Sequence, residues 1–599
     1  MSLLRASVTK AEYRQLSFIL VLALLLRLSG NLYDMPYGFH PDEYQYFDDA
    51  VEMMRKGIFR PASFRNPPLF NYGILLVLYV VYGAQYATGT IASLAEFLPS
   101  LPRAFAFGIA RGLAALAGTA ICCLLYLLGR RFGGRPAGIL VGTFYAVAFL
   151  SVRDAHFAVN DVPMVSLVTL AFLFALRLLE GGGHRDLVLG GLTAGLAAAT
   201  KYNGAIALLP LLLAAALGAQ GAATAGRVAR IGRAWLALLL LCLAGFLLGN
   251  PYSIFDTPAL LAGVSTQYGL RGIMWLGQST APVPLLVLQT LLTELGWPML
   301  LFFPFATAVC LARGGTRAKA ALLALSVVLP LLLYHSLQTL FFGRFLLPCT
   351  PFIVLICAWG LVGLREASAV SWGRHQFVLW AGVGLLIISP LARSVYLDVI
   401  LHRQDTRILA KEYLERVAPS RSIIAIIRDN SPYFTPPFNR MRYRLLNLPS
   451  DSPPPDPTMA PADYYIFSSF VTGQMSKSSA AKERSLLLAL ERHGFARTSI
   501  SPLRDGEAPP FEPDQVYLPY HQLFRYERPG PIIVIYSRPG APLPTSIDLS
   551  VGLGREWDRF SSEPRRRALT NAQRRPFGST KPAPMSFDQA QRGSLMEQA

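Results

Sequence analysis

Two acidic side chains stand next to each other just after the first hydrophobic segment of the chain. Asp42 and Glu43 follow His40 in the stretch His-Pro-Asp-Glu-Tyr. A carboxylate at the edge of a membrane is costly to desolvate, so such groups are functional candidates. An ionised carboxylate can act as a general base, because it holds a lone pair near the proton that it removes. In the alternative, structural interpretation, Asp42 is the N-cap of a helix over residues 43–56, a position that Asp favours.

A second polar group lies between two later apolar runs. The stretch RDAHFAVNDVP covers residues 153–163 and contains His156 and Asp161. These two side chains could position a sugar, a phosphate or a divalent cation, since carboxylate oxygens are ligands of hard cations. Asp161 precedes Val-Pro, so it is also a plausible helix N-cap, with proline in the first turn.

Three basic side chains occur where the neighbouring sequence is apolar or turn-like. Lys201 lies in TKYNG, together with Tyr202, and Arg344 lies in GRFLLP. Arg65 precedes Asn-Pro-Pro. A bound phosphate would give such cations a function, because Lys and Arg bind phosphate at close range. The alternatives are snorkelling to the membrane interface and pairing with an acid.

The composition indicates that these residues are positioned by membrane helices. Of the 599 residues, 53% are hydrophobic and 15% are charged, whereas soluble proteins carry about a quarter charged residues. The apolar residues form long runs, such as 235–248 and 377–388. The net charge of +19 fits the excess of Lys and Arg in cytoplasmic loops better than nucleic-acid binding, which is not expected. The six cysteines form no CxxC or Cys/His cluster, so the sequence indicates neither a zinc site nor a disulfide framework.

The distribution of basic residues predicts the topology. Arg5, Lys10 and Arg14 place the N-terminus in the cytoplasm, so residues 16–33 cross outward and Asp42 lies outside. About eleven spans follow from segment length and loop charge. The further predicted crossings are 104–128, 136–153, 162–180, 187–200, 203–219, 234–249, 284–311, 318–334, 345–364 and 377–396.

One apolar segment does not fit this alternation. Residues 67–91 are long enough to cross, but a crossing there would place every later basic loop outside. The segment is rich in tyrosine, which suits an interfacial helix, and we expect it to fold back at the outer face. The alternative is an ordinary span that violates the charge rule.

The sequence changes character after the last predicted span. We expect a membrane domain at 1–396, with juxtamembrane helices in its external loop 34–103. Residues 397–560 combine strand-like and helix-like runs, which predicts an extracytoplasmic α/β domain. Residues 561–599 are polar, basic and without periodicity, which predicts a disordered tail.

The polar motifs occur in an order and at spacings that resemble one known family. They are the Asp-Glu at 42–43, Asn-Pro-Pro-Leu at 66–69, the 153–163 stretch, Thr-Lys-Tyr at 200–202, Asn-Pro-Tyr at 250–252 and Arg-Phe-Leu-Leu-Pro at 344–348. Over roughly residues 10–396 the chain resembles the GT-C glycosyltransferases of the protein O-mannosyltransferase and lipid A aminoarabinose transferase type, that is, glycosyltransferase family 39 and its relatives.

This resemblance implies an inverting sugar transfer outside the membrane from a polyprenyl-phosphate-linked donor. It implies that Asp42 is the general base and Glu43 its companion. Asp161 matches the acid of the family's second loop, and Lys201 and Arg344 match positions expected to hold the lipid phosphate. His156, Tyr202 and Arg65 complete the expected substrate-binding set. The loop 253–283 is too short for the large insert of the eukaryotic enzymes, which weakens the case for a protein acceptor.

Several expectations about partners and location accompany this hypothesis. The acceptor is a glycan, a lipid or a protein, and the enzyme is a multi-pass protein of the cytoplasmic (inner) membrane. A divalent ion at Asp42, Glu43 and Asp161 is an open alternative, although a phosphodiester donor requires a metal less than a nucleotide sugar does. The main rival function is a lipid or solute transporter or flippase, which predicts repeated halves, and the sequence has no clear internal repeat.

Overall fold

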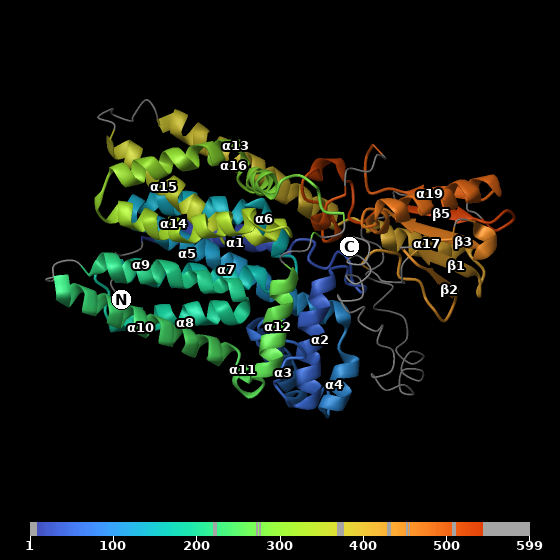
Figure 1. Cartoon of the computed structure of the whole chain (residues 1–599), viewed down its shortest axis with the longest axis horizontal. Helices are drawn as coiled ribbons and strands as arrows, with labels where there is room; N and C mark the ends of the chain where they lie inside the picture. The colour runs from blue at the N-terminus through green and yellow to red at the C-terminus, as the bar shows by residue number, and fades with distance from the viewer. Residues whose placement is uncertain are drawn as a thin grey trace. The chain divides into compact units, whose positions relative to one another are not determined.

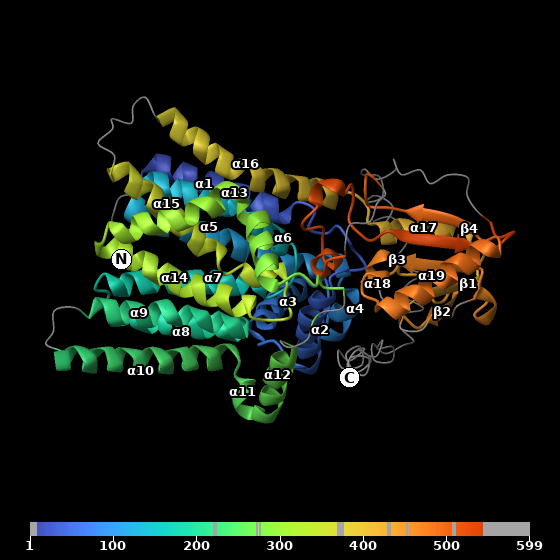
Figure 2. The same ribbon diagram turned by 45° about the horizontal axis from the view of Figure 1, so that its top comes forward.

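Apolar helices dominate the structure up to residue 401 and a small mixed sheet follows. The computed structural model describes residues 9–219, 224–270, 274, 277–367, 376–427, 433–450, 453–454, 456–505 and 511–542. The helices before the sheet are α1 (Lys10–Leu28), α2 (Pro41–Lys56), α3 (Leu69–Ala87), α4 (Leu94–Ser100), α5 (Arg103–Val147), α6 (Phe149–Asp154), α7 (Asp161–Leu179), α8 (His184–Thr200), η2 (Tyr202–Ala207), α9 (Leu208–Gly218), α10 (Thr224–Gly249), α11 (Tyr252–Phe255), α12 (Thr257–Gly269), α13 (Val283–Ala312), α14 (Gly315–Ser336), η4 (Gly343–Leu346), α15 (Thr350–Ala367) and α16 (Gln376–Leu401). Figures 1 and 2 show α7, α8, α9, α10 and α14 running side by side.

The helices confirm the prediction of a polytopic membrane protein. Among the described residues, seven helical stretches are long and apolar enough to cross a membrane when the broken helix α5 is counted once. They are Leu69–Ala87, Arg103–Val147, Asp161–Leu179, Gly226–Gly249, Val283–Ala312, Gly315–Ser336 and Gly384–Val417. The predicted total of about eleven crossings stays a prediction.

Two of these long helices are interrupted by a glycine with a left-handed backbone and a proline two residues later. In α5 the interruption is Gly134, with φ 62°, followed by Pro136, so the helix divides near the predicted boundary between crossings 104–128 and 136–153. In α13, which was predicted as one crossing, Gly296 has φ 75° and precedes Pro298. Glycine adopts positive φ without steric cost, and proline removes a helical hydrogen bond.

The segment that did not fit the charge alternation is helix α3. It packs on α2, α5 and α8, and α2 also packs on α4. Its length and composition place it among the candidate spans. The choice between a crossing and a helix that folds back at the outer face stays a prediction.

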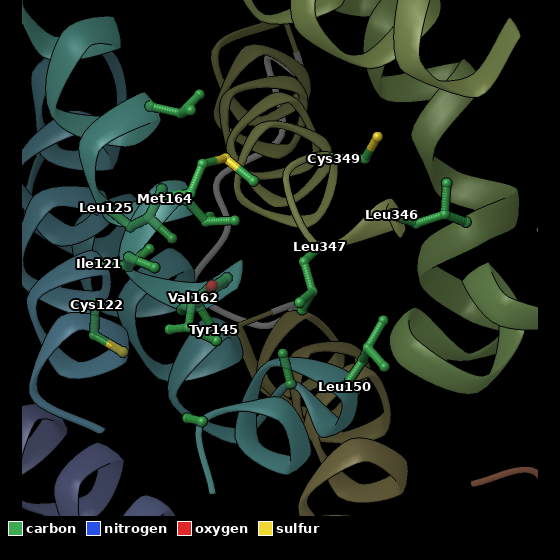
Figure 3. Packing of buried hydrophobic residues seen from close by; sticks show 14 of the residues in the cluster. Ile121, Cys122, Leu125, Tyr145, Leu150, Val162, Met164, Leu346, Leu347 and Cys349 are labelled. Atoms are coloured by element: carbon green, nitrogen blue, oxygen red, sulfur yellow. The ribbon is translucent and has the colours of Figure 1, made fainter. Parts of the chain in front are cut away.

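Much of the core of the helical part is built by α5, α7 and the stretch from η4 into α15. Figure 3 shows Ile121 and Leu125 of α5 near Val162 and Met164 of α7, with Leu347 close by. All five side chains are almost completely buried. This packing holds the start of α7 and the η4 turn, which carry two of the predicted site residues, in fixed positions.

The α/β region contains a five-stranded sheet with strand order β2-β1-β3-β5-β4. The strands are β1 (Ile423–Ile427), β2 (Arg444–Leu448), β3 (Tyr464–Ser468), β4 (Ala496–Ile500) and β5 (Ile533–Ser537). Its helices are α17 (Thr406–Val417), α18 (Ser469–Thr472) and α19 (Lys477–Arg492), with the short turns η5 (Pro457–Met459), η6 (Pro513–Val516) and η7 (Leu523–Arg525). β1 pairs in parallel with β2 and β3, whereas β5 is antiparallel to β3 and β4.

The described part of this region belongs to the same compact unit as the helices. The last membrane helix continues to Leu401, five residues beyond the predicted boundary at 396, and α17 begins at Thr406. The predicted tail at 561–599 and the end of the predicted α/β domain lie outside the described residues.

Candidate active site

The acidic stretch after α1 forms the beginning of helix α2. His40 is the N-cap, with φ −88° and ψ 115°, and its Nδ1 accepts a hydrogen bond from the Asp42 amide at 3.2 Å. Pro41 occupies the first helical position, where its fixed φ favours the helix. The structural interpretation of Asp42 as the cap is therefore wrong: His40 is the cap, and the helix starts at Pro41, two residues before the expected start at 43. The Asp42 carboxylate is not used for capping.

Asp42 instead forms an ion pair with Arg344, which the chain supplies from the η4 turn. Asp42 Oδ2 lies 2.8 Å from Arg344 Nη1, and the Asp42 side chain is 38% exposed whereas that of Arg344 is 13% exposed. The guanidinium carbon of Arg344 lies 5.1 Å from the ring centroid of Phe342 and 4.9 Å from that of Tyr517. The acid is thus the more accessible member of the pair, and the cation lies against two aromatic rings that also contact each other.

Asp161 and Lys201 form a second ion pair. Lys201 Nζ lies 2.6 Å from Asp161 Oδ1, at the start of α7 and the end of α8. Asn160, not Asp161, is the N-cap of α7, so the capping interpretation of Asp161 is also wrong. The Asn160 amide donates to the Thr200 carbonyl at 2.6 Å and joins these two helix ends.

The two ion pairs lie close enough to act on each other. Burial alone would raise the pKa of Asp42, but Arg344, His40 and Lys201 together hold this pKa below its usual value. The negative charges of Asp42 and Asp161 both act on Arg344. The structure therefore brings together the four residues that the sequence predicted as base, second acid and phosphate-binding cations.

Glu43 points away from this group into a buried clamp. Arg111 Nε and Nη2 donate to the two Glu43 carboxylate oxygens at 2.7 and 2.6 Å. The same guanidinium donates to Asp34 Oδ1 at 2.9 Å, and the Ala158 amide donates to Glu43 at 2.6 Å. The side chains of Glu43, Asp34 and Arg111 are fully buried. Glu43 thus fixes α2 to α5 and to the connection between α6 and α7.

Arg111 and Asp34 were not predicted from the sequence. An arginine within the apolar run 104–128 was a usable signal, because such residues need a partner. The partner itself could not be read from the sequence, since Asp34 lies 77 residues away.

His156 does not reach the paired acids. Its Nδ1 and Nε2 each lie 2.9 Å from a backbone carbonyl oxygen, of Val152 and Ser29, and Nε2 lies 3.6 Å from Asp398 Oδ1. The imidazole is fully buried. The structure gives it a position that joins α6 to the end of α1 and to α16.

Tyr202 and Arg65 border the site. The Tyr202 hydroxyl donates to the Phe64 carbonyl at 2.7 Å, which fixes the backbone next to Arg65. The charge of Arg65 acts on the buried Tyr46 hydroxyl, as do the charges of Asp42 and Asp161. Arg65, Asp42 and Asp161 thus all act on the same tyrosine, and the assignment of Arg65 to substrate binding stays a prediction.

The three acids proposed as a cation site are each engaged by a different basic side chain. In the part of the chain that the structure describes, no group of three His, Cys, Asp or Glu side chains is arranged to hold a metal ion. Asp42, Glu43 and Asp161 do not fit a shared cation in this arrangement. The divalent ion stays a prediction.

A cavity of about 650 Å³ lies in the α/β region rather than at the ion pairs. Its walls are formed mainly by β3, β5, α18 and α19 and include Phe467, Leu487 and Gln515. None of the predicted site residues lines it. The chemistry-bearing residues and this cavity are therefore different features of the molecule.

Comparison with known proteins agrees with the resemblance stated from the sequence. Residues 106–249 match the family model described as dolichyl-phosphate-mannose-protein mannosyltransferase. For the part of the chain that it covers, this match confirms the predicted likeness to a family of membrane glycosyltransferases. No curated protein matches the chain.

Solved structures that align with this chain include two of ArnT from Cupriavidus metallidurans. The one bound to undecaprenyl phosphate is 15% identical over 88% of this chain and 98% of its own, with a TM-score of 0.47. The apo form is 16% identical over 82% of this chain and 94% of its own, with a TM-score of 0.46. The archaeal oligosaccharyltransferase AglB from Archaeoglobus fulgidus, in complex with an inhibitory peptide and a dolichol-phosphate, is 13% identical over 83% and 74%, with a TM-score of 0.44.

Proposed function

We propose that the protein is an inverting glycosyltransferase that moves a sugar from a polyprenyl-phosphate-linked donor to an acceptor hydroxyl at the extracytoplasmic face of the cytoplasmic membrane. The observation that carries the proposal is the pair of neighbouring ion pairs, Asp42 with Arg344 and Asp161 with Lys201. Two cations suit a lipid phosphate and an exposed carboxylate suits a proton acceptor. The match of residues 106–249 to a family named for a dolichyl-phosphate sugar supports a donor of this class.

Donor binding would change the partner of each cation. Arg344 and Lys201 are engaged by acids in this structure, and the donor phosphate would compete with Asp42 and Asp161 for them. As Arg344 turns to the phosphate, the stabilisation of the Asp42 carboxylate decreases and its pKa rises. Asp42 then becomes a stronger base once the donor is in place.

The transfer itself is a single displacement. The acceptor oxygen forms a bond to the anomeric carbon of the sugar while its proton passes to Asp42. The bond between the anomeric carbon and the phosphate oxygen breaks, and the electron pair leaves with the lipid phosphate. Arg344 and Lys201 stabilise the negative charge that develops on this leaving group.

Glu43 supports this reaction without touching the substrate. Its clamp with Arg111 fixes the first turn of α2. Asp42 lies in the same turn, directly before Glu43. A catalytic group must be held within a fraction of an ångström of its working position. We therefore assign Glu43 a positioning function.

The direct test supplies purified protein with labelled polyprenyl-phosphate sugars and a panel of hydroxyl acceptors. We expect transfer by the parent and a loss of about 10²–10⁴-fold in kcat for Asp42→Asn, as for removal of a general base. Asp48→Asn, which changes an exposed acid of the same helix, is the matched control and should retain the parental rate.

Two outcomes would contradict the proposal in different ways. If Asp42→Asn transfers sugar as fast as Asp48→Asn, the assignment of the base fails. If the parent neither turns over nor binds any donor, the transferase proposal fails and the transporter alternative is favoured. Movement of a lipid or solute across the membrane of proteoliposomes would then test that alternative.

A further inference from the structure

One segment of the α/β region is built into the helical part of the molecule. This docked segment comprises residues 513–520, with the sequence PDQVYLPY, and begins with the η6 turn. Arg153 Nη2 donates to the carbonyl oxygens of Asp514 and Leu518 at 2.7 and 3.1 Å. The Gly343 amide donates to Asp514 Oδ2 at 3.0 Å. Arg153 of α6 thus holds the segment at Asp514 and at Leu518, and η4 holds it at Asp514.

The docked segment packs as part of the helical core. Tyr517, Leu518 and Tyr520 belong to the same buried cluster as the membrane helices, not to the separate cluster under the sheet. The Tyr520 ring lies so close to Gly343 that a Cβ there would be 3.1 Å from the Tyr520 hydroxyl oxygen. Any larger residue at position 343 would press on this ring, next to Arg344.

Tyr517 lies against two residues of the candidate site, His40 and Arg344. Its ring stacks on that of His40 at 4.4 Å with an interplanar angle of 20°, and only 7% of the residue is exposed. The guanidinium carbon of Arg344 lies 4.9 Å from the centroid of the Tyr517 ring and 5.1 Å from that of the Phe342 ring. The Tyr517 hydroxyl lies 3.4 Å from Arg344 Nη2. Tyr517 therefore touches the N-cap of α2 and the cation that pairs with Asp42.

We propose that the α/β region supplies Tyr517 as a positioning residue for Arg344, so that the phosphate-binding site is complete only with the docked segment in place. This inference rests on the proposed function, in which Arg344 binds the donor phosphate. An aromatic face attracts a guanidinium and fixes its plane, while leaving the N–H groups at its edge available to an anion. Tyr517 acts on the substrate only through Arg344.

The test measures the affinity for a short-chain polyprenyl phosphate in detergent and the KM and kcat with a polyprenyl-phosphate sugar. We expect Tyr517→Leu to weaken polyprenyl phosphate binding and to raise the donor KM by roughly tenfold, as for loss of a desolvated cation–π contact. Changes in kcat should be smaller than this. Tyr517→Phe keeps the ring and should stay within about threefold of the parent.

Two controls separate positioning from general damage. Tyr536→Leu removes a buried tyrosine of β5 that contacts the Glu491 side chain and none of the site residues, and it should leave the donor KM unchanged. In an Arg344→Gln background, Tyr517→Leu should raise the donor KM by less than about twofold further, because both changes remove the same interaction.

The outcomes distinguish this inference from the proposed function. The inference on Tyr517 is overturned if Arg344→Gln weakens polyprenyl phosphate binding and Tyr517→Leu does not. It is also overturned if the effect of the double variant on the donor KM equals the product of the effects of the two single variants. An equal rise in KM for Tyr536→Leu would overturn it too. If Arg344→Gln leaves binding unchanged, the assignment of Arg344 to the phosphate fails, and the proposed function fails with it.

Discussion

The central feature at the scale of single residues is that each predicted acid has a cationic partner. Charged residues in apolar surroundings are conspicuous in a sequence, and Asp42, Asp161, Lys201 and Arg344 were predictable for that reason. Their pairing was not, because Asp42 and Arg344 are 302 residues apart. Tyr517 gave no signal at all, since a tyrosine in a Pro-rich stretch is unremarkable until its neighbours are known.

The pairing of Asp42 with Arg344 predicts a change in pH dependence. The pKa of Asp42 lies below its usual value, so the ionised base persists to lower pH in the parent, and kcat/KM falls only when this group is protonated. Arg344→Gln removes a stabilising charge and raises this pKa, so the acid limb of kcat/KM should move to higher pH. Rate profiles normalised to their maxima measure the shift. Arg230→Gln, an exposed arginine of α10, should leave the limb in place, and an unmoved limb in Arg344→Gln would contradict the role of the pair.

At the scale of elements, the start of α2 is held by the buried clamp of Arg111 with Glu43 and Asp34. Removing one partner of a buried ion pair leaves an uncompensated charge in an apolar environment.

Other elements were predictable from the pattern of apolar residues alone. The central strands β1, β3 and β5 are nearly all apolar, which is a clear strand pattern, whereas the edge strands β2 and β4 mix polar and apolar residues and give a weaker one.

The clamp predicts a large loss of stability for a small change. Arg111→Met should destabilise the protein by about 3–5 kcal/mol, as expected for a broken buried ion pair. Thermal unfolding in detergent measures the effect. Arg55→Met removes a partly exposed arginine that pairs with Glu52 on the surface of α2, and should cost no more than about 1 kcal/mol. Equal losses for the two variants would show that the buried clamp is not a principal support of α2.

At the scale of the whole molecule, the sheet region and the helices share residues of one site. A boundary between a membrane part and an α/β part could be predicted from the change in composition near residue 396. The insertion of the docked segment could not be predicted, because Arg153 and Asp514 are separated by 361 residues and nothing in either stretch indicates the other. Long-range contacts of this kind leave no local periodicity.

The predicted orientation of the chain in the membrane can be tested directly. A cysteine in place of Met441, which is 89% exposed in the α/β region, should react with a membrane-impermeant maleimide added outside intact cells. A cysteine in place of Arg230 at the other predicted face should react only after lysis, since basic loops remain in the cytoplasm. The parent controls for its six native cysteines. Labelling of both positions from the same side would contradict the predicted topology.

The central claim is that the donor phosphate takes Arg344 from Asp42, which then serves as the base. The most direct measurement compares Asp42→Asn with the parent in two assays on the same preparation, polyprenyl phosphate affinity and sugar transfer. Because the substitution frees Arg344 and removes a negative charge, we predict that polyprenyl phosphate binds at least as tightly as in the parent while kcat falls by about 10²-fold or more. Binding weakened tenfold, or transfer at the parental rate, would contradict the account.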